Sequence, residues 1–174
     1  MTYSGCVAGN HDSKSDNLRP ECYEEFADYL IDVCRHYKDK YGIEFRTLEP
    51  FNEPMTDYWY AGGEQEGCHF GVGSQIDFLK VLAPKLRQSG LSTTVAVSDE
   101  TAVNQSVLDF IAYRDAGVLD MVGQWNTHSY TADDFSRAKL SSLCNEASIR
   151  LWMSEVGADG SGIRLSLIHI SEPT

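Results

Sequence analysis

Long apolar runs are absent from this 174-residue sequence, and basic residues are few. Lys and Arg together number 14, against 26 Asp and Glu, which gives a formal net charge of −12. A membrane-spanning helix needs about 20 consecutive apolar residues, so the sequence predicts no membrane span. Nucleic acids and anionic membranes bind clusters of Lys and Arg, so neither is expected as a partner.

Metal-ligand spacings are also missing. The five cysteines form no Cys-x-x-Cys pair and no two histidines stand at a ligand spacing, so we expect no structural zinc and no other metal. Cys22 and Cys34 fall on the apolar face of a predicted helix, where small buried side chains are expected. Cys6 and Cys68 lie in Gly-rich segments, and they form either free thiols or a disulfide if the protein is secreted.

The last ten residues, 165–174, look like the translated end of a sequencing adapter rather than natural protein sequence. We therefore expect residues 1–164 to form one folded unit and residues 165–174 to be a non-native tail. His169 and Glu172 are left out of the candidate site for this reason. No signal peptide is visible at the N-terminus.

Helical and extended patterns alternate along residues 1–164. Apolar residues recur at spacings of three and four between Pro20 and Tyr37, which is the period of one helix face. A capping box at Ser74 to Asp77 predicts the start of a later helix, which Pro84 is expected to kink or interrupt. The predicted helices are 20–37, 74–89, 105–114 and 131–145, and the predicted strands are 43–51, 93–98, 121–125 and 149–153.

This alternation predicts an α/β fold with a parallel sheet. An open nucleotide-binding sheet carries a Gly-rich turn after its first strand, and the sequence has neither G-x-G-x-x-G nor a Walker motif. In a (β/α)₈ barrel the functional residues gather at the C-terminal ends of the strands, where Glu53, His128 and Glu155 are expected. The sequence therefore favours part of a (β/α)₈ barrel, with about four of its eight strands.

Two glutamates close predicted strands, Glu53 in Asn52-Glu53-Pro54 and Glu155 after the final strand. A pair of carboxyl groups supplies both the proton donor and the nucleophile or base that glycosidic bond hydrolysis requires. Pro54 disfavours the helical region for the residue before it, so we expect Glu53 to be extended at its strand end. The Asn52 amide is expected to reach a sugar hydroxyl in the same pocket.

Several motifs in this order resemble the family-30 glycoside hydrolases of the retaining barrel clan. They occupy residues 1–5, 17–18, 50–54, 58–59, 65–70, 126–130 and 152–155. The resemblance implies a barrel segment that runs from the helix after strand 3 through strand 7. It also implies double displacement with retained configuration, without a cofactor.

The resemblance assigns a role to individual residues. Glu53 is expected to be the acid/base at the end of the fourth strand, and Glu155 the nucleophile at the end of the seventh. Asn52 would bind the 2-hydroxyl of the sugar that is cleaved. His128 and Tyr130, after the sixth strand, would line the same subsite. Trp59 is expected to stack on sugar rings, together with the preceding tyrosine, or to pack within its loop.

Within the family, residues 65–70 and 126–128 look most like the subgroup that cleaves β-1,6-galactan side chains of arabinogalactan. Xylanase, β-1,6-glucanase and glucosylceramidase activities remain alternatives, because specificity lies in loops. A non-catalytic carbohydrate-binding barrel protein and a metal-dependent hydrolase are rivals from other classes. We expect a secreted, monomeric protein that acts on a polysaccharide, and expect the chain by itself to be inactive because strands of the barrel are missing.

Overall fold

The computed structural model describes residues 14–59 and 67–156, and its core is a four-stranded parallel sheet. The strands follow one another in chain order. They are β1 (Thr47–Leu48), β2 (Thr94–Ala102), β3 (Gln124–Thr131) and β4 (Arg150–Glu155). The α/β prediction with a parallel sheet is confirmed. Cys6, the residues before Gly67 in the 65–70 motif and the expected tail at 165–174 lie outside the described residues, so those predictions stay predictions.

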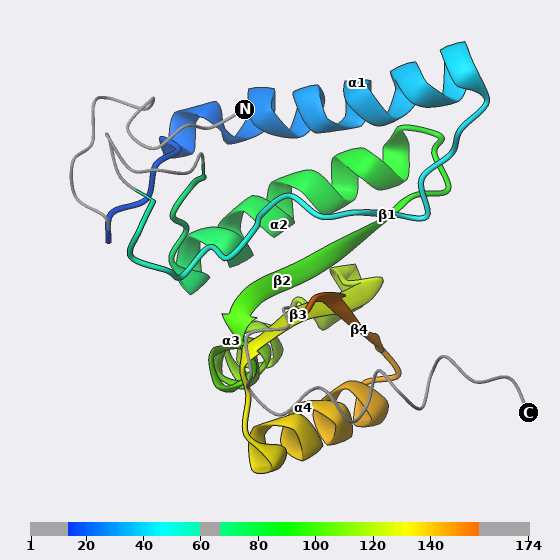
Figure 1. The fold of residues 1–174 in the computed structure, drawn as a ribbon. Helices are drawn as coiled ribbons and strands as arrows, with labels where there is room; N and C mark the ends of the chain where they lie inside the picture. The colour runs from blue at the N-terminus through cyan, green and yellow to red at the C-terminus, as the bar shows by residue number, and fades with distance from the viewer. Residues whose placement is uncertain (1–13, 60–66, 157–174) are drawn as a thin grey trace, which may run out of the picture.

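Helices separate the strands, as in a run of βα units. Figure 1 shows α1 and α2 side by side along one part of the sheet, with α3 and α4 following β2 and β3. This arrangement is that of a partial (β/α)₈ barrel. The helices are α1 (Tyr23–Tyr41), α2 (Val72–Gln88), α3 (Val103–Asp115) and α4 (Asp134–Glu146), with short 3₁₀ turns at Pro20–Cys22 and Leu119–Met121.

Helix α1 follows the predicted apolar period and buries one face against α2. Ala27, Ile31 and Cys34 are buried on that face, which confirms the prediction for Cys34. Cys22 instead lies before the helix and is only half-buried. The helix ends at Tyr41 and is capped by Gly42, whose φ of 67° suits a residue without a Cβ and whose N–H donates to the Lys38 carbonyl.

Helix α2 differs from its prediction at both Ser74 and Pro84. The helix begins at Val72, after Gly71, and the Ser74 hydroxyl donates to Asp16 instead of capping the helix. Pro84 stands inside the helix, which continues to Gln88. An interruption at Pro84 is therefore wrong, and the alternative, a kink, stays a prediction. The buried face around Pro84 packs into the core, and this packing outweighs the loss of one main-chain hydrogen bond.

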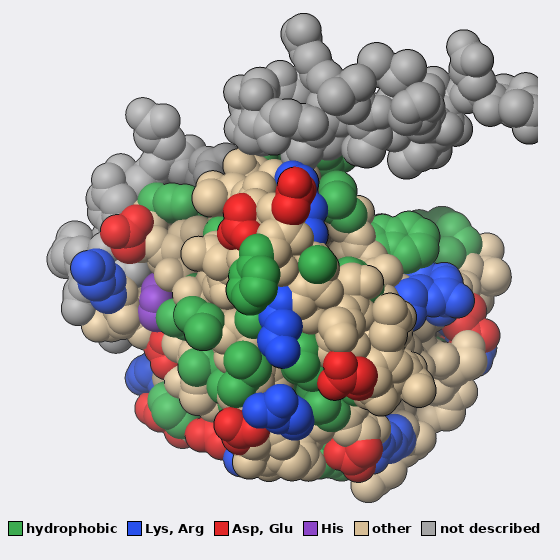
Figure 2. Space-filling model, turned by 90° about the horizontal axis from the view of Figure 1, so that it is seen from below, with side chains coloured by type: hydrophobic (Ala, Val, Ile, Leu, Met, Phe, Trp, Pro, Cys, Tyr) green, Lys and Arg blue, Asp and Glu red, His purple; other side chains and the backbone are tan. Residues whose placement is uncertain are grey.

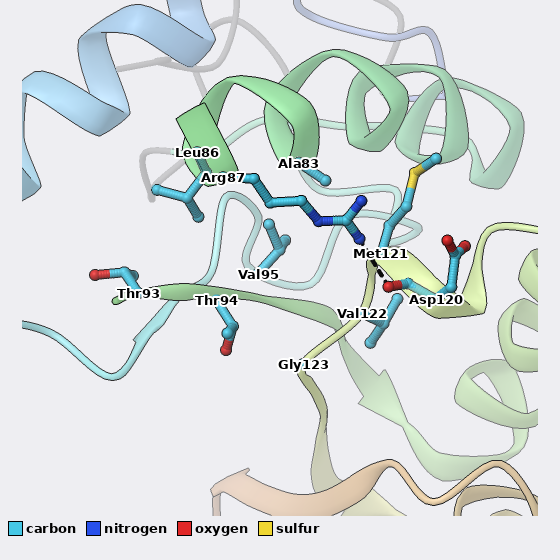
Figure 3. A pocket seen from close by; sticks show the side chains of 10 residues that line it. All are labelled: Ala83, Leu86, Arg87, Thr93, Thr94, Val95, Asp120, Met121, Val122 and Gly123. Carbon is cyan, nitrogen blue, oxygen red and sulfur yellow. Dashed lines mark hydrogen bonds between the residues drawn. The ribbon is translucent and has the colours of Figure 1, made fainter. Parts of the chain in front are cut away.

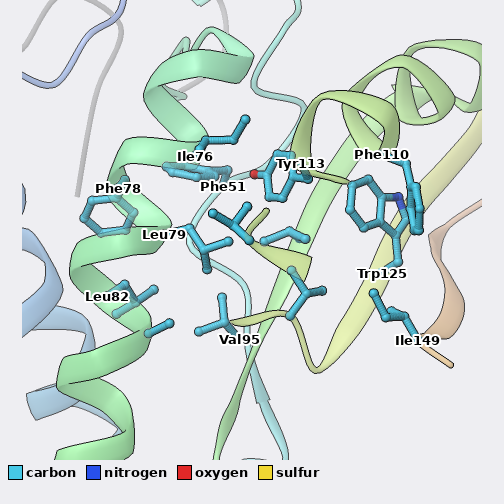
Figure 4. Packing of buried hydrophobic residues seen from close by; sticks show 14 of the residues in the cluster. Phe51, Ile76, Phe78, Leu79, Leu82, Val95, Phe110, Tyr113, Trp125 and Ile149 are labelled. Atoms are coloured by element: carbon cyan, nitrogen blue, oxygen red, sulfur yellow. The ribbon is translucent and has the colours of Figure 1, made fainter. Parts of the chain in front are cut away.

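Most of the largest core side chains come from α2, α3 and β3 (Figure 4). Phe110 and Tyr113 of α3 pack on Trp125, with ring centroids 4.8 and 5.3 Å apart. The indole N–H of Trp125 donates to the Ser106 hydroxyl at 2.8 Å, so this buried polar group is satisfied. Helix α3 is thereby fixed against the strand that carries His128.

All four strands have boundaries that differ from those predicted, and the differences are largest for β1 and β3. Only Thr47–Leu48 pairs within the segment predicted as a strand at 43–51. Strand β3 runs to Thr131, so His128 and Tyr130 lie within it and not after it. Apolar content suggested an early end for β3, but its polar residues are buried in a polar cluster and continue the pairing with β4.

Candidate active site

Glu53, His128 and Glu155 meet at one end of the sheet. One carboxylate oxygen from each glutamate and one ring nitrogen of His128 all lie within 4.8 Å of one another. Nδ1 of His128 is 2.9 Å from Oε1 of Glu53 and 3.6 Å from Oε2 of Glu155. Three segments that are far apart in the sequence thus bring two carboxylates and one imidazole together.

The Asn-Glu-Pro segment forms a turn rather than an extended strand end. Glu53 has a φ of 49°, in the left-handed region, so the expectation of an extended Glu53 before Pro54 is wrong. Main-chain contacts hold this unfavourable conformation. The Glu53 N–H donates to the Asp99 carbonyl at 2.9 Å, and the Thr56 N–H and hydroxyl both donate to the Glu53 carbonyl. Such strain persists only where surrounding contacts determine it, as often at functional sites.

Tyr58 and Trp59 both donate hydrogen bonds to Glu53 in this turn. The Trp59 indole N–H donates to the Glu53 carbonyl at 2.8 Å, and the side chain is only 2% exposed. Burial leaves no open ring face, so in this structure Trp59 positions the turn and does not present a surface for sugar stacking. Tyr58 is half-exposed, and its hydroxyl donates to Oε2 of Glu53.

His128 is a buried cation between carboxylates. Burial alone would lower the pKa of His128, but the nearby carboxylates of Asp99, Glu53 and Glu155 raise it to about 9. Nε2 lies 3.3 Å from Oδ1 of Asp99, within ion-pair distance but not aligned as a hydrogen bond. The ring therefore carries a proton at neutral pH. A cation at the centre of the cluster opposes the binding of a metal ion by the two glutamates.

Glu53 and Glu155 have different environments. Glu53 is buried, which would raise its pKa, but hydrogen bonds from His128 and Tyr58 hold that pKa below its ordinary value. Glu155 ends β4 and its side chain is 46% exposed. The Tyr130 hydroxyl donates to Oε2 of Glu155 at 3.1 Å. One carboxylate is thus enclosed and the other is open to an incoming molecule.

Asn52 is exposed beside Glu53, so its amide remains available to a ligand. Asp99 and Glu100, which are adjacent in β2, contact other residues of the protein. Asp99 contacts His128 and accepts from Ser154, while Glu100 lies in the core.

Glu49 is a site residue that the sequence reasoning missed. Its Oε2 accepts from the Asn126 amide at 3.0 Å, and burial together with the charge of Asp99 raises its pKa well above the ordinary value. The sequence held one signal, an acid next to Leu48 inside a segment predicted as a buried strand. Thr101, within β2, also contributes a hydrogen bond that lowers the pKa of Glu53.

A separate cavity of about 170 Å³ lies at the opposite end of the strands (Figure 3). It is lined where β2 begins, at Thr94 and Val95, and just before β3, at Gly123. The Arg87 guanidinium reaches across it and donates to the Asp120 carbonyl at 2.8 Å. This cavity therefore has no part in the carboxylate cluster.

The surface shows no gathering of basic side chains on the face in Figure 2, where Lys and Arg lie interspersed with Asp and Glu. Among the helices of the described residues, none has the length and apolar content needed to cross a membrane.

Parallel βα units with two neighbouring carboxylates at one end of the sheet are typical of barrel enzymes that hydrolyse glycosidic bonds. The model of O-glycosyl hydrolase family 30 matches residues 1–154. The chain belongs to this family, as its motifs suggested.

The chain is 35% identical over 161 residues to an endo-β-1,6-galactanase of Hypocrea rufa, covering 90% of this chain and 33% of that protein. It is 27% identical to an exo-β-1,6-galactobiohydrolase of Bifidobacterium longum subsp. longum, covering 92% of this chain and 13% of the relative. The structure of SrfJ from Salmonella typhimurium superposes with a TM-score of 0.66 at 26% identity, over 84% of this chain and 33% of the other. The chain thus spans a third or less of these relatives.

Proposed function

We propose that the protein carrying this chain is a retaining glycosidase that cleaves β-1,6-linked galactan, with Glu155 as nucleophile and Glu53 as acid/base. The observation that carries the mechanism is the approach of the two carboxylates, whose nearest oxygens lie within 4.8 Å. Retaining pairs stand about 5 to 5.5 Å apart, whereas inverting pairs stand roughly 6.5 to 9.5 Å apart to admit a water.

The environments of the two glutamates support this division of roles. Exposed Glu155, oriented by Tyr130, can attack the anomeric carbon of a sugar that enters from solvent. Glu53, enclosed by Tyr58 and His128, can protonate the departing oxygen and then take a proton from water. Asn52, exposed next to Glu53, would bind the 2-hydroxyl of the same sugar.

The proton needed by Glu53 resides on His128 in the free protein, because the pKa of His128 is raised to about 9 while that of Glu53 is lowered. Nδ1 lies 2.9 Å from Oε1 of Glu53, so the proton can pass directly between them. On this proposal kcat/KM falls above about pH 9, when the pair loses its last proton.

The choice of β-1,6-galactan rests on the two galactan-active relatives, an endo-acting and an exo-acting protein. Secretion agrees with a polysaccharide substrate and is part of the same proposal. Xylan and β-1,6-glucan are the competing substrates.

Activity is best measured in a completed barrel, in which the remaining barrel segments of the Hypocrea rufa galactanase flank this chain, because the chain spans 33% of that relative. Glu53→Gln and Glu155→Gln should each lower kcat by about 10³-fold or more while sugar affinity is retained. Glu146→Gln, which changes an exposed acid on α4, is the matched control.

Proton NMR of the first product formed from β-1,6-galactan should show the β-anomer. An α-anomer as first product, or glutamate variants as active as the control, would contradict the mechanism. Sugar binding without hydrolysis by the unsubstituted barrel would instead identify a carbohydrate-binding protein. Faster release from glucuronoxylan or β-1,6-glucan than from galactan would overturn the substrate assignment.

A further inference from the structure

A second acidic cluster lies in the core beneath the Glu53 turn. Glu100 of β2 and Asp109 of α3 are each only 1% exposed. In the part of the chain that the structure describes, no Lys, Arg or His perturbs either carboxyl group. Burying two ionised carboxylates without a cationic partner would cost free energy. We therefore expect at least one of the two groups to carry a proton.

Glu100 receives one donor from the active-site turn and one from α2. The Met55 N–H donates to Oε2 of Glu100, and the Gln75 amide donates to Oε1, both at 3.3 Å. Gln75 is itself fixed, because it accepts from the Tyr113 hydroxyl at 3.1 Å and donates to the Phe70 carbonyl at 3.0 Å. Glu100 therefore joins the turn to two helices.

The hydrogen bonds of Asp109 indicate which carboxyl group of the Glu100–Asp109 pair carries the proton. Its Oδ1 accepts from the Gln105 amide at 2.9 Å, whereas its buried Oδ2 has no well-formed hydrogen bond among the described residues, and the Ser98 hydroxyl nearby only partly offsets the effect of burial on the pKa of Asp109. A proton on Glu100, shared with Asp109, satisfies that oxygen and removes one of two buried charges. Burial first and the charge of Asp109 second raise the pKa of Glu100 to about 9, and burial also raises the pKa of Asp109.

We propose that Glu100 is a positioning residue for Glu53, acting as a neutral carboxylic acid that binds the Met55 N–H and bridges to Asp109. The inference rests on the proposed function, because Glu53 is assigned there as the acid/base. The ionisable groups that face Glu100 are Asp109 and Tyr113 from α3 and Glu49 from the segment after β1.

The geometry explains why a bond to Met55 acts on Glu53. Two adjacent residues of β2 hold the turn by hydrogen bonds. The Asp99 carbonyl accepts from the Glu53 N–H, and the Glu100 carboxyl group accepts from the Met55 N–H. Glu53 is held at a positive φ between these two bonds. Loss of the second bond lets the turn relax, and a displacement of about 1 Å at a reacting group can lower a rate by about 100-fold.

The experiment compares Glu100→Gln with Glu100→Ala in the completed barrel. The glutamine is neutral, can accept from Met55 and can donate to Asp109, so kcat should stay within about threefold of the unsubstituted barrel. The alanine should lower kcat by about 10- to 100-fold with little change in KM. Tyr113→Phe is the matched control, because it removes a buried hydrogen bond of the same network without touching the turn.

A second readout needs no hydrolysis. The chain has four methionines, so labelling with ¹⁵N-methionine gives few amide signals, and Met55→Leu assigns the one of interest. Because His128 beside Glu53 titrates in the same range, both samples carry His128→Gln. As the pH rises through about 9, the Met55 amide should shift in the His128→Gln chain, and this shift should be missing when Glu100→Gln is added.

The outcomes are distinct. Glutamine as damaging as alanine would mean that Glu100 acts as an anion, and an equal loss of kcat in Tyr113→Phe would mean that the network only stabilises the fold. Either result overturns the proposal, as does a Met55 titration in the His128→Gln chain that is identical with and without Glu100→Gln. A barrel that cleaves no sugar would refute the proposed function. The Met55 titration would still decide whether Glu100 binds the Met55 N–H as a neutral carboxylic acid.

Discussion

His128 should make the stability of this chain depend on pH. Its folded-state pKa is about 9, against 6.5 for an ordinary histidine, so the folded state holds the proton more tightly than the unfolded chain. At about 1.4 kcal/mol for each pH unit, the interval corresponds to about 3 kcal/mol. The side chain is fully buried, so screening by solvent does not reduce this figure much.

The raised pKa of His128 decides in which direction the stability changes with pH. A group whose pKa is raised on folding contributes fully below its unfolded value, here pH 6.5, and the contribution is lost as the pH rises through about 9. The free energy of unfolding should therefore fall by about 3 kcal/mol between pH 6 and pH 10 on account of His128 alone.

Urea unfolding of the chain and of His128→Gln, repeated between pH 6 and pH 10, isolates this contribution. The difference between the two free energies of unfolding should shrink by about 3 kcal/mol across the range, because other titrating groups, including Glu100, contribute equally to both proteins. His36→Gln removes an exposed histidine from α1 and controls for the substitution itself. A difference that is constant, or that grows with pH, would refute the assignment of His128 as a buried cation.

Two further predictions concern packing. A Cβ at Gly123 would lie 2.3 Å from Oγ1 and 2.5 Å from Cβ of Thr94, so Gly123→Ala should lower the free energy of unfolding by about 1 to 3 kcal/mol. Gly73→Ala, where a Cβ meets no atom within 4 Å inside α2, should instead stabilise by about 0.5 to 1 kcal/mol in the same urea assay. Phe110→Ala should cost about 3 to 5 kcal/mol because the ring is buried against a tryptophan, whereas Leu108→Ala, 59% exposed on the same helix, should change stability by less than about 1 kcal/mol. Equal effects within either pair would count against the packing described.

The order of helices and strands could be predicted because apolar periodicity survives in each element. Helix α1 occupies Tyr23–Tyr41 against a predicted 20–37, and β4 occupies Arg150–Glu155 against a predicted 149–153. The end of strand β3 could not be predicted from apolar content. Gln124, Asn126 and His128 are polar, so hydrophobicity suggested a strand that ends early, but they are buried and bond to groups from distant segments.

The conformation of Glu53 could not be predicted from its neighbours. The preference of a residue before proline is for extended backbone, but contacts to Asp99, Thr56 and Trp59 impose a left-handed one. Those contacts connect residues up to 46 positions apart, from 53 to 99. The role of Trp59 likewise depends on burial, which a local pattern does not show.

The order of the strands also bears on how the chain assembles during synthesis. Register partners are 47 to 94, 96 to 124 and 124 to 150, so the loops that pairing must close are short and similar in cost. Each strand leaves the ribosome when its neighbour is already complete, and none has to insert between two strands that are already paired. Glu53 is therefore made first, His128 is added next, and the site becomes complete only when β4, with Glu155 as its last residue, docks on β3.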